Sequence, residues 1–534
     1  MSVKNAVILA AGRSSSFAPF SYELPKALFK VKGETLIERQ IRQLKEAGVR
    51  NIVVVAGSMR EKLFFLEEKW GVIIIENSYY ASCNNIFSIR CAREYMSDCF
   101  LCHCDNYYVS NPFVNHKYTA QSYRLAVEKE GIDKEFNCYA DDDGRIKRII
   151  SNDYNAPYSL VGYSYWSSAF ADEFFRLYDI AECGLNARHY FWEDFVGLHL
   201  DRLPFFIKVI KGGEVFEFDD IEEVRAFDSN LIENLDSRIV TNICNILGCE
   251  GNEIKNIKTV AKGLTNVSFT FTVKDEIFVY RHPGGTSSVT ANRPAEYQAQ
   301  KLAYEFGLDK TLVYIHPTDG WKISRFIQKT HDFAYSDRAS LHKVLKRLRK
   351  FHLSGGVIDY IYDPLKTSDR MMDMACQMDP NLRSEFSGMR TKIGKLYKYT
   401  KMDGFPLCPC HGDCYWPNFL ISDDDLNIID WEFAGMCDPA NDFGGIVGRD
   451  DRFNDERDIE QLLEVYLGHP PDYVERRHYF SFIAIDAWLY FCWSIYKAGV
   501  NEPNGFFMHS CYKQMNRFAD KMLMAYEKEY GRGR

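Results

Sequence analysis

The first part of the chain alternates short β-branched runs with helix-like segments, and this alternation constrains its fold more than any other feature. The segment TLIERQIRQLKEAG, for example, separates the first two runs. The four runs are NAVILAA from Asn5, NIVVVAG from Asn51, GVIIIEN from Gly71 and CFLCHCD from Cys99. Strands that alternate with helices predict a mostly parallel sheet covered on both faces. Ligands of such sheets bind beyond the carboxyl ends of the strands, which brings AAGRSSS and CDNYY to one crevice.

The pattern changes near the middle of the chain, whose 534 residues are too many for one hydrophobic core. Residues 229–250 read as a single amphipathic helix. After it, NVSFTFTVKDEIFVYRHPGG reads as a β-hairpin around KDE, and long helices follow to the end. We therefore predict an α/β domain with a Rossmann-like mixed sheet over residues 1–228, a linker helix over 229–250 and an α+β domain over 251–534.

Composition excludes several classes of protein. Hydrophobic residues make up 46% and charged residues 26%, which predicts folded globular domains. The net charge of −9, without a basic block, argues against a nucleic-acid surface. The sixteen cysteines are irregularly spaced, as expected for reduced thiols. The pairs CHCD and CPCH, at Cys102 and Cys408, lack the usual zinc spacing, so buried apolar side chains are the better interpretation.

Neither long apolar run predicts targeting or membrane insertion. The first has six apolar residues from Ala6, too few for the core of a signal peptide. The second, Phe480 to Trp493, contains Asp486 and is shorter than the about 20 residues that a membrane span needs. We expect a soluble, cytoplasmic protein, and the sequence leaves its oligomeric state open.

The segment HGDCYWPNF has the spacing of a kinase catalytic loop: His, one residue, Asp, four residues, Asn, and then an Asp after the next strand. His411, Asp413, Asn418 and Asp430 reproduce it. We expect Asp413 to accept the proton of an acceptor hydroxyl. Asn418 and Asp430, with Asp413 beside them, are the predicted magnesium ligands, because phosphoryl transfer needs charge neutralised by a metal.

Upstream segments supply the remaining parts of a nucleotide site. KGLTNVSF offers Gly263, Thr265 and Asn266 in a turn between two strands, where a loop covers the phosphates of ATP. Arg281 lies on the next predicted strand, where a kinase keeps a cation for the α- and β-phosphates. Glu296 of NRPAE lies on a predicted helix and is expected to pair with that cation. Taken singly, each would be an ordinary surface ion pair or turn.

As a set, GLTN, YRHPGGT, NRPAE, HGDCYWPNF, IDWE and DPANDFG resemble the choline/ethanolamine kinase family over about residues 255–500. The resemblance implies a protein-kinase-like fold of the aminoglycoside phosphotransferase type. It also implies ATP as phosphoryl donor and Arg281 in place of the lysine of protein kinases.

The choline site implied by this resemblance lies on the helix IDAWLYFCWSIYKAG. Tyr490, Trp493 and Tyr496 recur at spacings of three, so they share adjoining strips of one helix face. A quaternary ammonium donates no hydrogen bond and is best held over aromatic rings. The alternative is that these aromatics are core residues. Asp486, one turn before Tyr490, could add negative charge near the cation.

The first domain resembles the bacterial phosphocholine cytidylyltransferase family over residues 3 to about 225. The resemblance rests on VILAAG running into a polar loop, on LPKAL, on KGETLIERQ and on Asp105 at a strand end. Backbone N–H groups of Ala11, Gly12 and Arg13 would then cradle CTP, and Lys26 would neutralise it.

The same resemblance implies further site residues. Asp105 corresponds to the magnesium-binding Asp, and FEFDD supplies a second acid, for which we choose Asp219 over Asp220. Two carboxylates suit a hard cation that bridges phosphate oxygens. Residues of ASCNNIFSI are expected near the base, and residues of YFWEDF either seat the choline head or belong to a packed helix. The residues concerned are Asn84, Asn85, Trp192 and Glu193.

One residue departs from the cytidylyltransferase pattern. Ser16 stands where the triphosphate-binding Arg is expected, which weakens the triphosphate site unless Arg13 reaches across. Together the two halves predict a bifunctional enzyme that phosphorylates choline with ATP and couples phosphocholine to CTP. The alternatives are ethanolamine or another amino alcohol as acceptor, or an active kinase beside a non-catalytic nucleotide-binding domain.

Overall fold

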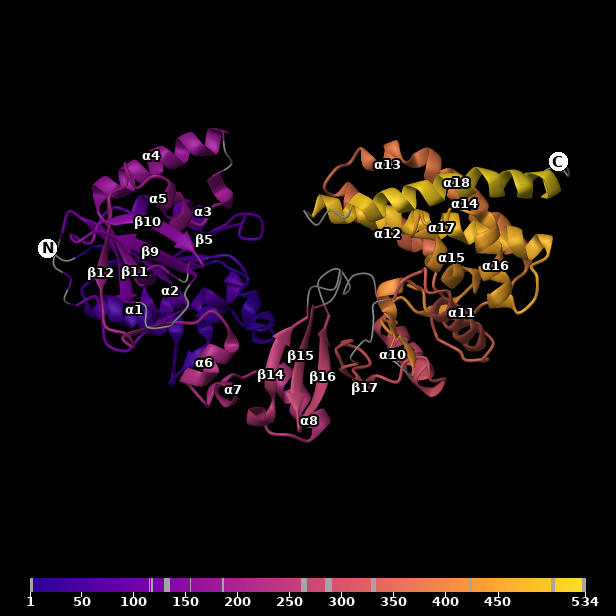
Figure 1. The fold of residues 1–534 in the computed structure, drawn as a ribbon, viewed down its shortest axis with the longest axis horizontal. Helices are drawn as coiled ribbons and strands as arrows, with labels where there is room; N and C mark the ends of the chain where they lie inside the picture. The colour runs from indigo at the N-terminus through magenta and orange to yellow at the C-terminus, as the bar shows by residue number, and fades with distance from the viewer. Residues whose placement is uncertain are drawn as a thin grey trace. The chain divides into compact units, whose positions relative to one another are not determined.

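The computed structural model describes residues 3–114, 116, 119–128, 135–153, 155–184, 187–260, 267–283, 291–327, 333–421, 425–500 and 505–530. The chain forms two compact units, residues 1–259 and 260–534 (Figure 1). Residues 229–250, predicted as a linker, belong to the first unit.

In its described part, the first unit is built on a mixed sheet of nine strands. The order is β10–β9–β11–β6–β1–β4–β5, with β8 beside β11 and β12 beside β8. The strands are β1 Asn5–Ala10, β4 Asn51–Ala56, β5 Ile73–Glu76, β6 Cys99–His103, β8 Ser122–Glu128, β9 Phe136–Ala140, β10 Ile146–Ser151, β11 Tyr158–Trp166 and β12 Phe205–Val209. The four predicted runs form β1, β4, β5 and β6, which are parallel, whereas β11 is antiparallel to β6.

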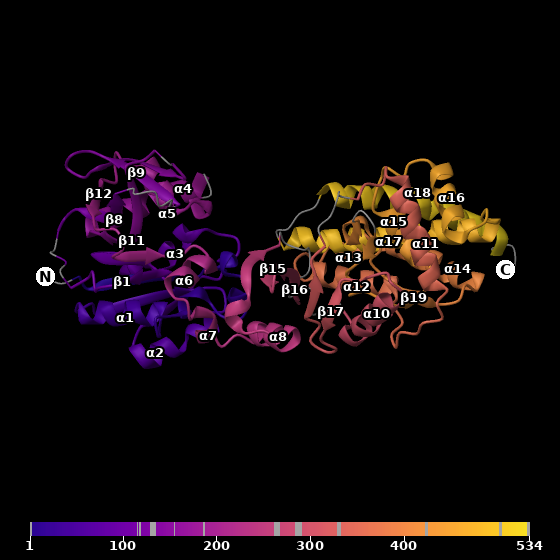
Figure 2. The ribbon, with the colours of Figure 1, turned by 60° about the horizontal axis from the view of Figure 1, so that its bottom comes forward.

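Helices cover both faces of this sheet (Figure 2). Successive side chains of a strand point to opposite faces. Val7 and Leu9 of β1 therefore join a core cluster with α3, α4 and α5, whereas Ala6 and Ile8 join a second cluster with α1 and α2. These helices are α1 Leu36–Glu46, α2 Phe65–Trp70, α3 Asn85–Cys91, α4 Ser168–Gly184 and α5 Trp192–Leu198. The predicted covering on both faces is confirmed.

Short elements complete the first unit and place site residues. Strand β7 follows Asp105 and pairs with β13. These elements are β2 Lys30–Val31, β3 Glu34–Thr35, β7 Asn106–Tyr108, β13 Val215–Glu217, α6 Ile221–Phe227, α7 Leu231–Asn234, α8 Arg238–Leu247 and β14 Lys255–Thr259.

The predicted single helix at 229–250 is two helices, α7 and α8. Ser237 interrupts it, because its side chain accepts the backbone N–H of Val240 and begins α8 as an N-cap. The Ser237 hydroxyl also donates to Glu23, 2.5 Å away, and this bond links the start of α8 to the N-terminal part of the first unit.

The second unit contains an antiparallel sheet in the order β15–β16–β18–β17. Val273 pairs with Glu276, so Lys274 and Asp275 form a two-residue turn, both with positive φ, 49° and 67°. This is the geometry of a tight hairpin turn, and the predicted hairpin around KDE is confirmed. The strands are β15 Val267–Val273, β16 Glu276–His282, β17 Leu312–Ile315 and β18 Lys322–Arg325. The predicted phosphate loop with Gly263, Thr265 and Asn266 lies outside the described residues.

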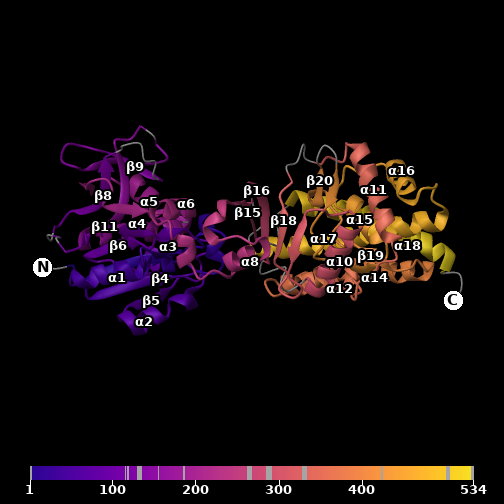
Figure 3. The ribbon, with the colours of Figure 1, turned by 90° about the horizontal axis from the view of Figure 1, so that it is seen from below.

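Helices make up most of the rest of the second unit (Figure 3). Two short strand pairs, β19 with β22 and β20 with β21, frame the HGDCYWPNF segment. The bounds are α10 Arg293–Glu305, α11 Arg338–His352, α12 Pro364–Cys376, α13 Leu382–Glu385, α14 Ser387–Thr400, β19 Cys408–Cys410, β20 Phe419–Ile421, β21 Leu426–Ile428, β22 Gly435–Cys437, α15 Ala440–Gly448, α16 Glu456–Leu467, α17 Tyr473–Gly499 and α18 Gly505–Tyr530.

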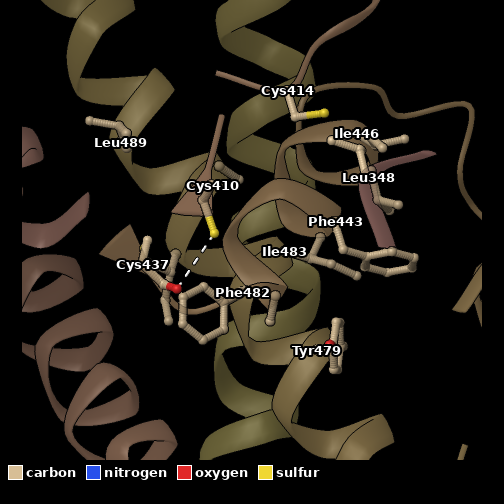
Figure 4. Packing of buried hydrophobic residues seen from close by; sticks show 14 of the residues in the cluster. Leu348, Cys410, Cys414, Cys437, Phe443, Ile446, Tyr479, Phe482, Ile483 and Leu489 are labelled. Carbon is tan, nitrogen blue, oxygen red and sulfur yellow. Dashed lines mark hydrogen bonds between the residues drawn. The ribbon is translucent and has the colours of Figure 1, made fainter. Parts of the chain in front are cut away.

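The core of the second unit gathers around α15 and α17. Phe443 and Ile446 of α15 pack in one cluster with Phe482 and Ile483 of α17, and Leu348 of α11 lies beside them (Figure 4). The cysteines of both CHCD and CPCH are buried. None of the helices in the described ranges is both long and apolar enough to cross a bilayer.

Candidate active sites

The second unit contains a cavity of about 730 Å³ that collects most of its predicted site residues. One end is polar and the other aromatic. Of the residues predicted from the sequence, those that line it are Arg281, Asp413, Asn418, Asp430, Tyr490 and Trp493. Glu296 contacts Arg281 but does not itself line the cavity, and Tyr496 does not line it either.

Buried hydrogen bonds to Asp442 and Ile429 hold the loop that carries Asp413. His411 is buried, and its Nε2 lies 2.9 Å from the carbonyl oxygen of Ile429. The backbone N–H groups of His411 and Gly412 donate to the carboxylate of Asp442 on α15, at 2.7 and 2.9 Å. Gly412 has φ +80°, and a Cβ there would lie 2.2 Å from the carbonyl oxygen of Phe433, so only glycine fits.

Each carboxylate oxygen of Asp413 accepts a bond from the protein. Oδ1 accepts from Nη1 of Arg449 at 2.5 Å and from the hydroxyl of Tyr490. Oδ2 accepts from Nδ2 of Asn418 at 3.2 Å. Asp413 therefore faces the cavity as a hydrogen-bonded carboxylate, and the metal site on Asp413, Asn418 and Asp430 stays a prediction.

Arg281 joins the strand, the helix and the predicted metal ligand. Its guanidinium contacts Glu296 of α10, lies 3.1 Å from Oδ1 of Asp430 and donates to the carbonyl oxygen of Gly320 at 2.6 Å. Burial opposes the charge of Arg281, but Glu296 and Asp430 raise its pKa. The pairing with Glu296 that the sequence predicts is present in the structure.

Lys322 of β18 is a second cation at the polar end, and sequence reasoning missed it. Burial lowers its pKa, and the positive charge of Arg281 adds to this effect. Burial also opposes ionisation of Asp430, but Lys322 and Arg281 hold its pKa below the usual value. The polar end thus places two cations beside the carboxylate of Asp430, as a site for polyphosphate and metal requires.

The donor set at this end fits a hard divalent cation. Nδ2 of Asn418 donates to Asp413, which leaves the side-chain carbonyl oxygen of Asn418 as a possible metal ligand. Asp430 has φ +68°, a conformation that Asp tolerates, and its carboxylate lines the cavity. Amide and carboxylate oxygens are the ligands that Mg²⁺ takes in proteins.

The aromatic end is formed by Tyr415, Tyr490, Trp493 and Phe507. The rings of Tyr490 and Trp493 are 6.1 Å apart, and each lies about the same distance from Phe507, at 6.1 and 6.0 Å. One side of Tyr490 faces Arg449, whose guanidinium carbon is 3.4 Å from the ring centroid.

The predicted negative charge of Asp486 is not offered to a ligand. Asp486 is buried, and it holds Arg449 by two bonds of 2.8 Å. Its charge is therefore compensated inside the protein.

The first unit contains a smaller cavity of about 250 Å³ at the carboxyl ends of β1 and β6. Ala11, Gly12, Lys26, Asn84, Asn85 and Asp105 line it. Arg13 is exposed and is not among the lining residues, but its guanidinium lies 5.9 Å from the ring of Tyr80, which lines the cavity.

Lys26 and Asp105 form an ion pair in this cavity. Burial opposes both charges, but each partner favours the charge of the other: the pKa of Lys26 is raised and that of Asp105 is lowered. The second oxygen of Asp105, Oδ1, is buried without a hydrogen-bond partner among the described residues. Such an oxygen is a free ligand position for a cation.

Glu217, two residues before Asp219, is the acid that approaches Asp105. His103, Asp105 and Glu217 each offer one ligand atom within 4.8 Å of the others. Burial lowers the pKa of His103, which favours the neutral form that binds metal. Asp219 is not in this group: it is exposed, and its carbonyl oxygen accepts the hydroxyl of Ser16 at 2.6 Å. Asp219 stays a prediction from the sequence, and Glu217 of the same FEFDD segment is a second candidate ligand.

Trp192 and Glu193 belong to a packed helix, the second of the two interpretations given above. Trp192 is 1% exposed and packs on Trp166 and Phe205, with ring centroids 5.5 and 6.1 Å away. Glu193 is also 1% exposed and pairs with Arg124 at 2.6 Å. Neither side chain lines the cavity.

Five residues that sequence reasoning did not single out belong to the two sites: Lys322, Asp442, Arg449, His103 and Glu217. Asp442 and Glu217 stand inside motifs already quoted, DPANDFG and FEFDD. His103 lies two residues before Asp105, on the strand face that an alternating pattern places beside it. Lys322 and Arg449 carried no local signal, because each reaches its partners only through the tertiary fold.

Comparison with known proteins identifies a different family in each half. The model of the MobA-like NTP transferase domain matches residues 6–136, and that of the phosphotransferase enzyme family matches residues 330–479. The first unit has a nucleotidyltransferase fold and the second a kinase-like fold, as the sequence predicts.

Individual proteins are similar to parts of this chain. A choline-phosphate cytidylyltransferase of Streptococcus pneumoniae is 30% identical over 226 residues, 42% of this chain and 97% of the relative. A 2-aminoethylphosphonate cytidylyltransferase of Lancefieldella rimae is 31% identical over 231 residues, 43% of this chain and 93% of the relative. The crystal structure of choline kinase LicA from Streptococcus pneumoniae is similar at 20% identity and a TM-score of 0.44, covering 54% of this chain and 98% of that one.

Proposed function

Because the chain belongs to the MobA-like NTP transferase family through its first unit and carries a phosphotransferase-family domain in its second, we propose that it makes CDP-choline in two steps. In the first step ATP phosphorylates choline. In the second, phosphocholine reacts with CTP and releases pyrophosphate. The substrates are small molecules, and both nucleotides are cytoplasmic, which is where we propose that the protein acts.

The observation that carries this proposal is the make-up of the larger cavity. It joins a polar end with Arg281, Lys322 and Asp430 to an aromatic end with Trp493, and Asp413 lies on the wall they share. A polyphosphate suits the first end and a methylated cation the second. The reacting hydroxyl would then meet the γ-phosphate beside Asp413.

In the kinase step, the oxygen of the acceptor hydroxyl forms a bond to the γ-phosphorus, and the bond from that phosphorus to the β–γ bridging oxygen breaks. Asp413 takes the proton of the hydroxyl, and ADP leaves. Arg281 and Lys322 stabilise the negative charge of the phosphates. Asn418 and Asp430 would hold Mg²⁺, which supplies further charge neutralisation when bound.

In the cytidylyl step, a phosphate oxygen of phosphocholine bonds to the α-phosphorus of CTP and pyrophosphate leaves. The nucleophile is already an anion, so this step needs no strong base. Lys26 would stabilise charge on the α-phosphate, and backbone N–H groups after Ala11 would bind the triphosphate. Asp105, with Glu217 and His103, would hold the metal ion, whose role is charge neutralisation.

The fused phosphotransferase domain favours a phosphate ester over a phosphonate. One relative is named for 2-aminoethylphosphonate, whose phosphorus is bonded to carbon. A phosphotransferase that acts on a hydroxyl makes a bond from phosphorus to oxygen, so its product would be phosphocholine or phosphoethanolamine. Ethanolamine is the second candidate acceptor, and the aromatic end of the cavity is the reason that we prefer choline.

The test is incubation of the full chain with choline, ATP, CTP and magnesium, with products identified by mass. We expect phosphocholine and CDP-choline. Asp413→Asn should stop phosphocholine formation but still convert added phosphocholine to CDP-choline. Asp105→Asn should still form phosphocholine but make no CDP-choline. A wild-type chain that makes neither product would refute the proposal.

A kinase beside a silent first unit is the remaining alternative. The observation behind it is Ser16, which bonds to the Asp219 carbonyl where the family has Arg. Titration of CTP with magnesium separates the two cases, since a silent unit would show no binding. If binding is weak, Ser16→Arg should strengthen it.

A further inference from the structure

Arg449 is a wholly buried arginine at the wall of the larger cavity. Its side chain is 0% exposed, and it binds three groups at once. Nε and Nη2 donate to the two oxygens of Asp486 at 2.8 Å each, and Nη1 donates to Oδ1 of Asp413 at 2.5 Å. The flat side of the guanidinium lies on the ring of Tyr490, 3.4 Å from its centroid.

Glycines allow this arrangement. Arg449 follows α15, and Gly448 at its end lies so close to α17 that a Cβ would be 2.7 Å from the carbonyl oxygen of Ile483 and 3.5 Å from Asp486. The close packing of α15 on α17 is seen around Phe443 and Ile483 in Figure 4. It brings the end of α15 within reach of Asp486 on α17.

These contacts fix which oxygen of Asp413 is held. Oδ1 accepts two bonds, from Arg449 and from the hydroxyl of Tyr490. Among the described residues, Oδ2 accepts only the longer bond from Asn418, at 3.2 Å. The weakly held oxygen is therefore the one available to an acceptor hydroxyl.

The same contacts change the role of Tyr490. Arg449 occupies one side of its ring, and the Tyr490 hydroxyl is bound to Asp413. Arg449 contacts Tyr415 and Tyr490, so Trp493 and Phe507 are the aromatic residues of this end whose rings face the cavity without it. Arg449 carries one positive charge and contacts two carboxylates, so it does not neutralise both when both are ionised.

We propose that Arg449, anchored by Asp486, is a positioning residue for the kinase step: with Tyr490 it holds Oδ1 of Asp413 so that Oδ2 takes the proton of the acceptor hydroxyl. The proposal rests on the kinase function proposed above. Arg449 acts through Asp413 and touches neither substrate.

The experiment compares four variants of the full chain in the kinase reaction with choline and ATP. Arg449→Met removes the guanidinium but leaves Asp486 buried without a partner. Arg449→Met combined with Asp486→Leu removes both members of the buried pair, which is often tolerated. Arg449→Lys keeps the charge. Arg452→Met is the matched control, because Arg452 pairs with Asp450 and is 66% exposed.

We expect kcat to fall by about 100-fold in both variants that carry Arg449→Met, which is within the range of general base catalysis. The KM values for choline and ATP should stay within about threefold, because no substrate contact is lost. Arg449→Lys should recover part of kcat, since one ammonium can hold Asp413 but not both carboxylates. Arg452→Met should match the wild type.

Two results would overturn the inference: a kcat within about threefold of the wild type in the double variant, or a raised choline KM at unchanged kcat, which would make Arg449 a binding residue. Conversion of added phosphocholine to CDP-choline, measured on every variant, controls for folding of the first unit, and thermal unfolding controls for the second. A wild-type chain that phosphorylates none of choline, ethanolamine and related amino alcohols would instead refute the proposed function.

Discussion

The guanidinium of Arg281 lies between two carboxylates, in contact with Glu296 and 3.1 Å from Oδ1 of Asp430. Glu296 is 0% exposed, and its other carboxylate oxygen, Oε2, accepts a bond from Nη1 of Arg293 at 2.6 Å. One side chain therefore connects helix α10, strand β16 and the residue expected to bind metal. Its planar fork suits this bridge, whereas a single ammonium reaches fewer acceptors.

The first prediction concerns this bridge. Arg281→Lys should lower kcat/KM for ATP by about 10- to 100-fold, because lysine keeps the charge but loses the second contact. Initial rates at varied ATP measure it. The control is Arg338→Lys, since Arg338 forms an exposed pair with Asp458 and should stay at the wild-type rate. Equal rates in the two variants would remove Arg281 from the nucleotide site.

The second prediction separates the two acids of FEFDD. Glu217→Gln should lower the CTP-dependent rate by at least about 10- to 100-fold and raise the magnesium concentration needed, because it removes a ligand beside Asp105. Asp219→Asn should stay within about threefold of the wild type. Magnesium titrations of both variants with phosphocholine and CTP provide the measurement. A larger loss in Asp219→Asn than in Glu217→Gln would restore the sequence-based choice.

The catalytic loop shows what the sequence could predict. Asp413, Asn418 and Asp430 lie within eighteen residues of one another, so their spacing alone carried the prediction, and all three line one cavity. The alternation of strands and helices likewise predicted the sheet of the first unit. Local patterns of this kind are predictable from sequence because the elements that carry them are short and continuous.

Other site residues could not be found this way. Arg449 is one of many arginines, and only the packing of α15 on α17 brings it to Asp413. Trp192 and Tyr490 are both aromatic residues on helices, yet the first is buried in the core and the second lines a cavity. Burial distinguishes them, and burial follows from contacts between segments far apart in the chain.

The third prediction tests the aromatic end of the cavity. Trp493→Ala should raise the KM for choline by about 2- to 30-fold, the range for loss of one cation–π contact of about 0.5–2 kcal/mol. Tyr496→Ala should change it by less than about twofold, because Tyr496 does not line the cavity. Steady-state kinetics with choline and with ethanolamine give the comparison. A rise in KM with Tyr496→Ala equal to that with Trp493→Ala would return Tyr496 to the choline site.

The fourth prediction concerns His478 of α17, which is buried between two carboxylates. Its Nδ1 is 3.0 Å from Asp403, and its Nε2 is 2.9 Å from Asp438. Burial opposes protonation, but hydrogen bonds to Asp403 and Asp438 raise the pKa of His478 above its ordinary 6.5. The ring also stacks on Phe405, with centroids 4.0 Å apart.

The sign of the pH dependence follows. A group whose pKa is raised by folding stabilises the folded state fully below its unfolded pKa, and this contribution is lost as pH rises through the folded pKa. The wild type should therefore lose stability relative to His478→Gln as pH increases above about 6.5, by at most about 1.4 kcal/mol per pH unit. Asp403, whose pKa is lowered, stays ionised over this range. Calorimetric unfolding of both proteins from about pH 5.5 to 9 measures the difference. If the difference were constant with pH, or grew as pH rose, His478 would not be the charged partner of Asp403 and Asp438 in the folded state.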